Sequence, residues 1–131
     1  MTANELETRL IDFAVRCTYL CRELHKLGHF DSRHVAGQLL RAGTHAGFHY
    51  PEARAAESDR DFIHKIKVLL KELRESQAEL RYIQQMQYFP QERTDPLLDE
   101  AGQLVAIFMA TVKKVESKQL PAKRIKRTPP R

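Results

Sequence analysis

The residues whose type and spacing best suit a chemical role are two pairs of histidines. His25 and His29 lie four positions apart, and so do His45 and His49. On a helix this spacing puts two imidazoles on one face, where they can share a metal ion. A metal site in a helical bundle needs ligands from several helices, and neither an H-E-x-x-H motif nor a repeated Glu-x-x-His is present. We therefore expect surface or interface histidines and predict no metal and no cofactor.

The residue sets that mark common enzymes are missing from the sequence. It holds no recognisable Ser-His-Asp set, glycine-rich phosphate loop or paired-carboxylate cleft. The chain is therefore predicted not to be an enzyme.

Two cysteines, Cys17 and Cys21, lie one helical turn apart. Nothing nearby completes a four-ligand set of the C-x-x-C type, so we expect reduced thiols in a core. The N-terminal residues lack the basic and then apolar layout of a secretory signal. No apolar run approaches the roughly 20 residues of a membrane span. These features predict a cytoplasmic protein without a membrane partner.

The C-terminal end carries most of the positive charge. Residues 113–131 hold eight basic side chains and one acidic one, whereas residues 1–112 hold 14 basic and 16 acidic ones. Such a segment is either a solubilising terminus or an arm that binds the phosphates of RNA or DNA. It has no aromatic residue for base stacking, so the predicted contact is to the backbone. The residues predicted to bind nucleic acid are Lys113, Lys114, Lys118, Lys123, Arg124, Lys126, Arg127 and Arg131.

Four amphipathic segments must position these residues. Apolar side chains recur at helical intervals in residues 4–27, 32–50, 58–88 and 95–118. Short connections favour antiparallel neighbours, so we predict an all-α, up-down-up-down four-helix bundle over residues 1–118. Residues 119–131 are cationic and interrupted by proline, and we expect a disordered basic tail there. Tandem helical hairpins are the alternative, but no repeat of solenoid period supports them.

Local signals predict the ends of these helices. Residues 31–32 (Asp-Ser) and Ser58 are good N-cap residues for the second and third helices. Asp95 followed by Pro96 is a favoured pairing of N-cap and first helical residue. Pro51 lacks an N–H group, so a kink or an end of the second helix is expected at that point.

Small residues recur along the second segment. Ala42, Gly43, Ala46 and Gly47 lie at helical spacing, and Gly37 is a third glycine of the same segment. A glycine costs about 1 kcal/mol against alanine in a helix. A helix that keeps several is expected to need the room for close packing, so this segment is predicted to be the innermost contact of the bundle.

The first segment has apolar residues on two sides. Ile11, Val15 and Tyr19 lie one turn apart, opposite the main apolar face. In so small a chain, a second apolar face is expected to be covered by another subunit. We therefore predict a homo-oligomer.

Arg41 is expected to form an ion pair with Glu52 or Glu72. A structural pair would fix the register of two helices. A pair at the subunit contact would instead belong to a shared polar cluster.

Residues 41–53 read R-A-G-T-H-A-G-F-H-Y-P-E-A. This stretch resembles the hallmark of the bacterial four-helix-bundle family, also called the large-subunit (23S) rRNA intervening-sequence proteins. That family typically reads R-A-A-x-S-I-A-A-N-I-A-E-G. The departures from it are His45, His49 and Pro51. The positions that match across the helical body are Arg41, Ala42, Ala46, Gly47, Glu52, Phe62 and Glu72.

The resemblance implies a closed ring of bundles, commonly a homopentamer. Related bundles include the accessory variability determinants of diversity-generating retroelements, which are basic pentamers that work beside a reverse transcriptase and its RNA. The resemblance therefore implies a non-enzymatic accessory protein that binds RNA or DNA, with a reverse transcriptase as a possible partner. A scaffold ring that binds another protein, without nucleic acid, is the alternative.

Overall fold

The computed structural model describes the backbone of residues 1–127 and the side chains of residues 1–118. Within these limits the chain is helical, with short connections and no strand. The elements in chain order are α1 (Ala3–Lys26), α2 (Phe30–Arg54), α3 (Asp59–Met86), the 3₁₀ turn η1 (Gln91–Arg93) and α4 (Asp95–Arg127).

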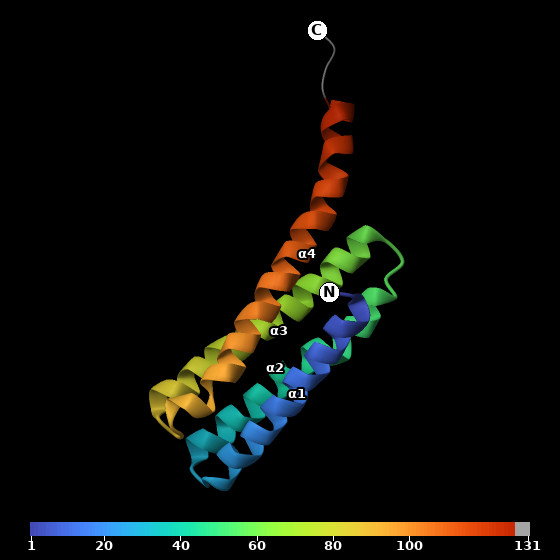
Figure 1. Cartoon of the computed structure of the whole chain (residues 1–131). Helices are drawn as coiled ribbons and strands as arrows, with labels where there is room; N and C mark the ends of the chain where they lie inside the picture. Colours follow the sequence, from blue (N-terminus) through green and yellow to red (C-terminus); the bar gives the residue numbers. More distant parts are fainter. Residues whose placement is uncertain (128–131) are drawn as a thin grey trace.

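Consecutive helices run in opposite directions and pack side by side (Figure 1). Helices α1 and α4 meet more sparsely, through a two-pronged ion pair. There Arg9 donates from Nε to Glu100 Oε2 at 2.9 Å and from Nη2 to Oε1 at 2.6 Å. The predicted all-α, up-down-up-down four-helix bundle is confirmed.

One apolar stripe from each helix meets in a single core. Phe13, Leu39, Leu73 and Phe108, one from each helix, have no exposed surface. Burying a side chain of this size contributes about 1.5–3 kcal/mol, so packing holds the helices in place. Leu27, the last residue of the first predicted segment, is 39% exposed because α1 ends before it.

Two helices begin at places that the local signals missed. Helix α2 begins at Phe30, because the Ser32 hydroxyl bonds back to the N–H of His29 at 3.3 Å rather than capping a later start. Asp95 is the first residue of α4 rather than its cap, and the Thr94 carbonyl accepts from the N–H of Leu98 at 3.0 Å. Ser58 caps α3 as predicted, accepting from the N–H of Asp61 at 3.1 Å.

Helix α2 continues through Pro51 to Arg54, so it does not end at the proline. The carbonyl that the Pro51 ring crowds in a helix is that of Gly47, four residues earlier. The turn after the proline is held by packing, since Ala53 is 1% exposed.

The last helix does not end at residue 118. The backbone of α4 is helical to Arg127, and this end of the helix extends past the other three (Figure 1). Residues 128–131, and all side chains after Lys118, lie outside the described residues. The predicted disorder of the tail over residues 119–131 therefore stays a prediction.

Candidate functional site

The described part of the basic segment presents its lysines to solvent. Lys113, Lys114 and Lys118 are exposed on the last described turns of α4. The acidic side chain among them, Glu116, lies 3.4 Å from Nζ of Lys67 on α3. The side chains of the other predicted nucleic-acid-binding residues lie outside the described ones, namely those of Lys123, Arg124, Lys126, Arg127 and Arg131.

The small residues of α2 lie against α1. A Cβ atom on Gly43 would lie 2.8 Å from Sγ of Cys17, which is closer than real Cβ contacts come. On Gly47 it would lie 3.1 Å from Cδ1 of Ile11. Ala46 is completely buried. Gly37 differs, because nothing lies within 4 Å of the position that a Cβ atom would take there, and close packing does not explain it.

A charged cluster joins α2 to α3. Arg41 lies 3.0 Å from Oε2 of Glu72 through Nη1 and 2.7 Å from Oε2 of Glu75 through Nη2. Nδ1 of His45 lies 2.7 Å from the same oxygen of Glu72. Glu72 is only 7% exposed, so it is a buried carboxylate held by two partners. The cluster fixes the register of the two helices within one subunit.

Glu52 is not the partner of Arg41. The two residues are eleven positions apart on one helix, which separates them by about 16 Å along its axis. Glu52 instead lies 3.0 Å from Nδ1 of His49.

The histidine pairs are not arranged as a metal site. The rings of His45 and His49 meet edge to face with centroids 5.0 Å apart, and each Nδ1 faces a carboxylate. His29 precedes α2, so it does not share a helix with His25. In the described part of the chain, no three His, Cys, Asp or Glu side chains are grouped to hold a metal ion.

Glu79 is a polar residue that the sequence reasoning missed. Its Oε1 atom is buried without a hydrogen-bond partner in the structure. Burial, together with the nearby negative charge of Glu75, raises the pKa of this carboxyl to about 7. The available signal was the spacing of Glu72, Glu75 and Glu79, which puts three acids on one helical face.

The two cysteines are free and buried in the core. Burial raises the pKa of the Cys21 thiol to about 12 and that of Cys17 further still. Both thiols are therefore protonated and poor nucleophiles at neutral pH.

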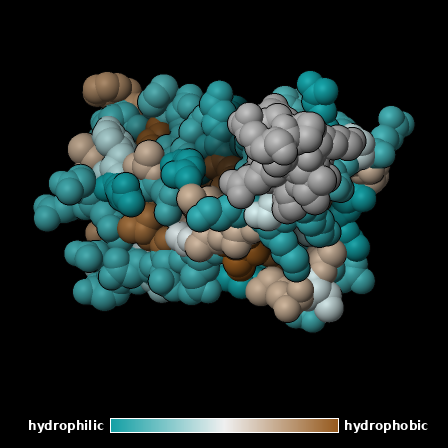
Figure 2. Space-filling model, turned by 90° about the horizontal axis from the view of Figure 1, so that it is seen from above, coloured by the Kyte–Doolittle hydropathy of each residue, from teal (hydrophilic) through white to brown (hydrophobic). Residues whose placement is uncertain are grey.

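The second apolar face of α1 is open to solvent. Ile11, Val15 and Tyr19 are 42%, 45% and 57% exposed. On α2, Leu40 and Phe48 are also exposed, and the sequence patterns did not single them out. Seen from above, the molecule is mostly hydrophilic, with hydrophobic residues in separate patches (Figure 2).

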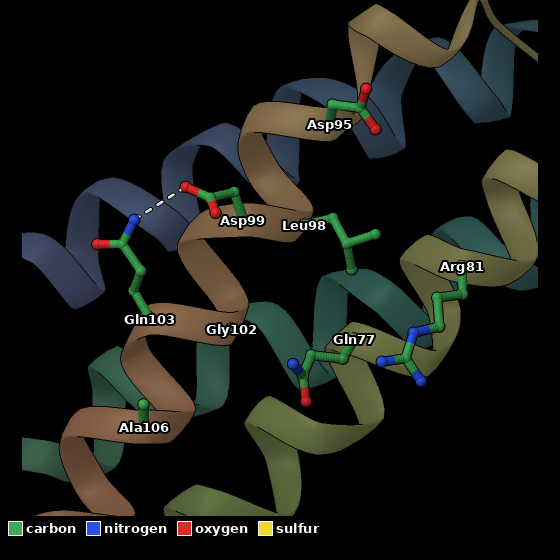
Figure 3. Close-up of a pocket in the computed structure, with 8 residues that line it drawn as sticks. All are labelled: Gln77, Arg81, Asp95, Leu98, Asp99, Gly102, Gln103 and Ala106. Atoms are coloured by element: carbon green, nitrogen blue, oxygen red, sulfur yellow. Dashed lines mark hydrogen bonds between the residues drawn. The ribbon is translucent and has the colours of Figure 1, made fainter.

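A shallow groove of about 640 Å³ runs between α3 and α4 (Figure 3). Gln77 and Arg81 reach it from α3, while Asp99 on α4 accepts a 2.8 Å hydrogen bond from Gln103. Gly102 adds no side chain to its floor. The groove pairs no nucleophile with a base, so its geometry offers no catalytic arrangement.

The bundle has a counterpart among solved structures. The chain is similar to a protein of unknown function from Bacteroides thetaiotaomicron VPI-5482. That protein belongs to the S23 ribosomal protein family. The two are 26% identical with a TM-score of 0.77, and the match covers 86% of this chain and 99% of the other. No family model and no curated protein matches the chain.

The S23 neighbour agrees with the 23S-related resemblance of residues 41–53 and with the observed bundle. As for membranes, none of the described helices has both the length and the apolar content to cross one.

Proposed function

We propose that this chain is a non-enzymatic, self-associating bundle protein that binds the backbone of RNA or DNA through its basic C-terminal segment. The observation that best supports this proposal is the uneven distribution of charge along the chain. Residues 113–131 hold eight basic side chains and one acidic one, at the end of a helix that extends past the bundle (Figure 1). Phosphates neutralised by such a segment release counterions, which makes the affinity depend on salt.

The resemblance to rRNA intervening-sequence proteins and the S23 neighbour support a nucleic-acid partner. A role beside a reverse transcriptase, as in diversity-generating retroelements, rests on the sequence resemblance alone. Cytoplasmic location belongs to the same proposal.

Self-association is supported by the exposed face of Ile11, Val15 and Tyr19. We propose that this face is covered in a ring of identical subunits, with the pentamer that the resemblance implies. Several basic segments on one ring would act together, which raises avidity without any new contact.

The test uses two variants that each remove three positive charges. In K123Q/R124Q/K126Q the charges leave the basic segment, and in the matched control R60Q/K71Q/R81Q they leave exposed positions of α3. Binding of a labelled single-stranded RNA is measured by fluorescence anisotropy across a salt series. We expect the slope of log K against log salt to become shallower by about 2 in the first variant and to stay unchanged in the control.

Equal slopes and equal affinities for the two variants would contradict a role of the basic segment. The second candidate function is then a scaffold that binds another protein, which the exposed apolar surface of α1 and α2 favours. That function predicts capture of a protein partner that nuclease treatment does not release.

A further inference from the structure

A second groove lies between α1 and α2, close to the connection that joins them. Its volume is about 410 Å³, within the range of small-molecule sites. Its floor is apolar, and its rim is cationic. The residues that line it include Arg22, His25, Arg33, Ala36, Gly37 and Leu40. None of the residues that line it is acidic.

The two helices that line this groove carry exposed aromatic rings, and Phe30 lies one helical turn before Arg33. Tyr19 is 57% exposed, and the Arg22 guanidinium stacks over its ring at 5.5 Å from the centroid. Phe30 is 89% exposed at the first position of α2. Its ring has no role in capping that helix, because His29 is the cap residue.

The acidic side chains nearest in sequence are engaged elsewhere. Glu23 accepts from Arg93, which precedes α4. Asp31 accepts a 2.5 Å hydrogen bond from the hydroxyl of Tyr88. Arg22 and Arg33 line the groove and no acidic residue does, so the charge at its rim is positive.

Gly37 supplies independent support. Glycine weakens a helix relative to alanine, and nothing packs within 4 Å of the place of its missing Cβ. A side chain there would extend into the groove, so glycine keeps the groove open at a cost in stability. Natural sequences break such local rules mainly at functional or strained positions, and Gly37 is not strained.

We propose that the α1–α2 groove binds single-stranded nucleic acid. Unpaired bases stack on Phe30, and Arg22, Lys26 and Arg33 meet the phosphates. The inference rests on the proposed function. It adds to that function a site that binds single-stranded nucleic acid in preference to duplex.

The groove and the basic segment lie at opposite ends of the bundle (Figure 1). A strand held by both must run along the molecule, or bridge neighbouring subunits. Duplex competes poorly for the groove, because stacked and paired bases do not reach exposed rings.

The first test places a reporter in the groove. The chain has no tryptophan, so Phe30→Trp gives a single tryptophan at the proposed stacking position, which can be excited apart from the four tyrosines. The control is Phe48→Trp, at another exposed phenylalanine of α2, 61% exposed. We expect a single-stranded oligonucleotide of uridines to quench tryptophan at position 30 and to leave the control unchanged.

The second test fills the groove without disturbing the fold. Gly37→Leu adds a side chain where there is open space, and Gln38→Leu is the control at the adjacent exposed position. We expect Gly37→Leu to weaken oligonucleotide binding by about tenfold, as loss of a stacked base does, with no fall in melting temperature. The control keeps the native affinity.

The outcomes separate the two proposals. Oligonucleotide that binds by anisotropy, without quenching at position 30 and with equal affinity for both leucine variants, overturns the groove and leaves the basic segment as the site. Absence of any binding by the native chain overturns the proposed function and the groove with it. A tryptophan at position 30 that responds to anionic lipid vesicles, but not to the oligonucleotide, also overturns the groove.

Discussion

At the scale of single residues, the fold changes the acid–base chemistry of Glu79. Arg41 and His45 hold Glu72, and Arg41 holds Glu75, but the buried Oε1 of Glu79 has no partner. Its raised pKa is the consequence, since burial penalises the charged carboxylate.

This shift predicts a dependence of stability on pH. The folded pKa of Glu79 is about 7 against 4.5 for the unfolded chain, so the folded state binds the proton more tightly. The contribution to stability is complete below pH 4.5 and is lost as the pH rises through 7. Glu79→Gln removes this loss of stability at high pH. We expect the substitution to raise the free energy of unfolding by about 1 kcal/mol at pH 8, which is less than the pKa shift alone implies because solvent screens a half-buried carboxylate.

Urea unfolding at pH 5 and pH 8 measures this effect. The gain should be near zero at pH 5, and the exposed control Glu57→Gln should show none at either pH. A gain of the same size at both pH values would show that ionisation of Glu79 is not its cause.

Sequence reasoning reached part of this cluster. Arg41 and Glu72 were expected to pair because charged side chains on neighbouring helices set their register. The burial of Glu79 and the exposure of Phe30 depend on how far each helix is rotated and where it begins. Those are properties of the packed bundle, which periodicity along one segment does not determine.

At the scale of the elements, the contact between α1 and α2 is set by glycines of different kinds. Gly43 and Gly47 let the helix backbones approach, whereas Gly37 faces open space. The same substitution should therefore have opposite effects within one helix.

We expect Gly43→Ala to lower the free energy of unfolding by about 1–3 kcal/mol, because its Cβ overlaps Cys17. Gly37→Ala should raise it by about 0.5–1 kcal/mol through helix propensity alone. Chemical unfolding of both variants measures the difference. Equal effects would show that the packing of α1 against α2 is looser than the structure has it.

The four helices were predictable because their apolar spacing persists over several turns. The ends of the helices were less predictable from the sequence. Ser32 has the right chemistry for a cap but bonds back to His29, and tertiary packing of Ala53 carries α2 past Pro51. Local signals compete with such contacts, and the contacts win where burial is complete.

At the scale of the whole molecule, the account rests on two features, the apolar residues exposed on α1 and α2 and the cationic C-terminal segment. The charge asymmetry was readable from composition, because it needs no knowledge of the fold. The α1–α2 groove could not be predicted from the sequence, because it is formed by residues from two helices.

Self-association predicts a particle heavier than the 15.2 kDa chain in sedimentation velocity. Val15→Glu places a charge in the exposed apolar face and should shift the particle to the monomer. Val68→Glu is the control at a similarly exposed valine of α3 and should leave the assembly intact. A native chain that sediments as a monomer would remove the ring from the proposal.

The most direct measurement is the salt dependence of the affinity of the unmodified full chain for a labelled single-stranded RNA. We predict binding at low salt that weakens linearly on a double-logarithmic plot with a slope of about −3 or steeper, as expected when four or more phosphates are neutralised. An affinity that does not change with salt, or no binding at low salt, would contradict a nucleic-acid-binding function.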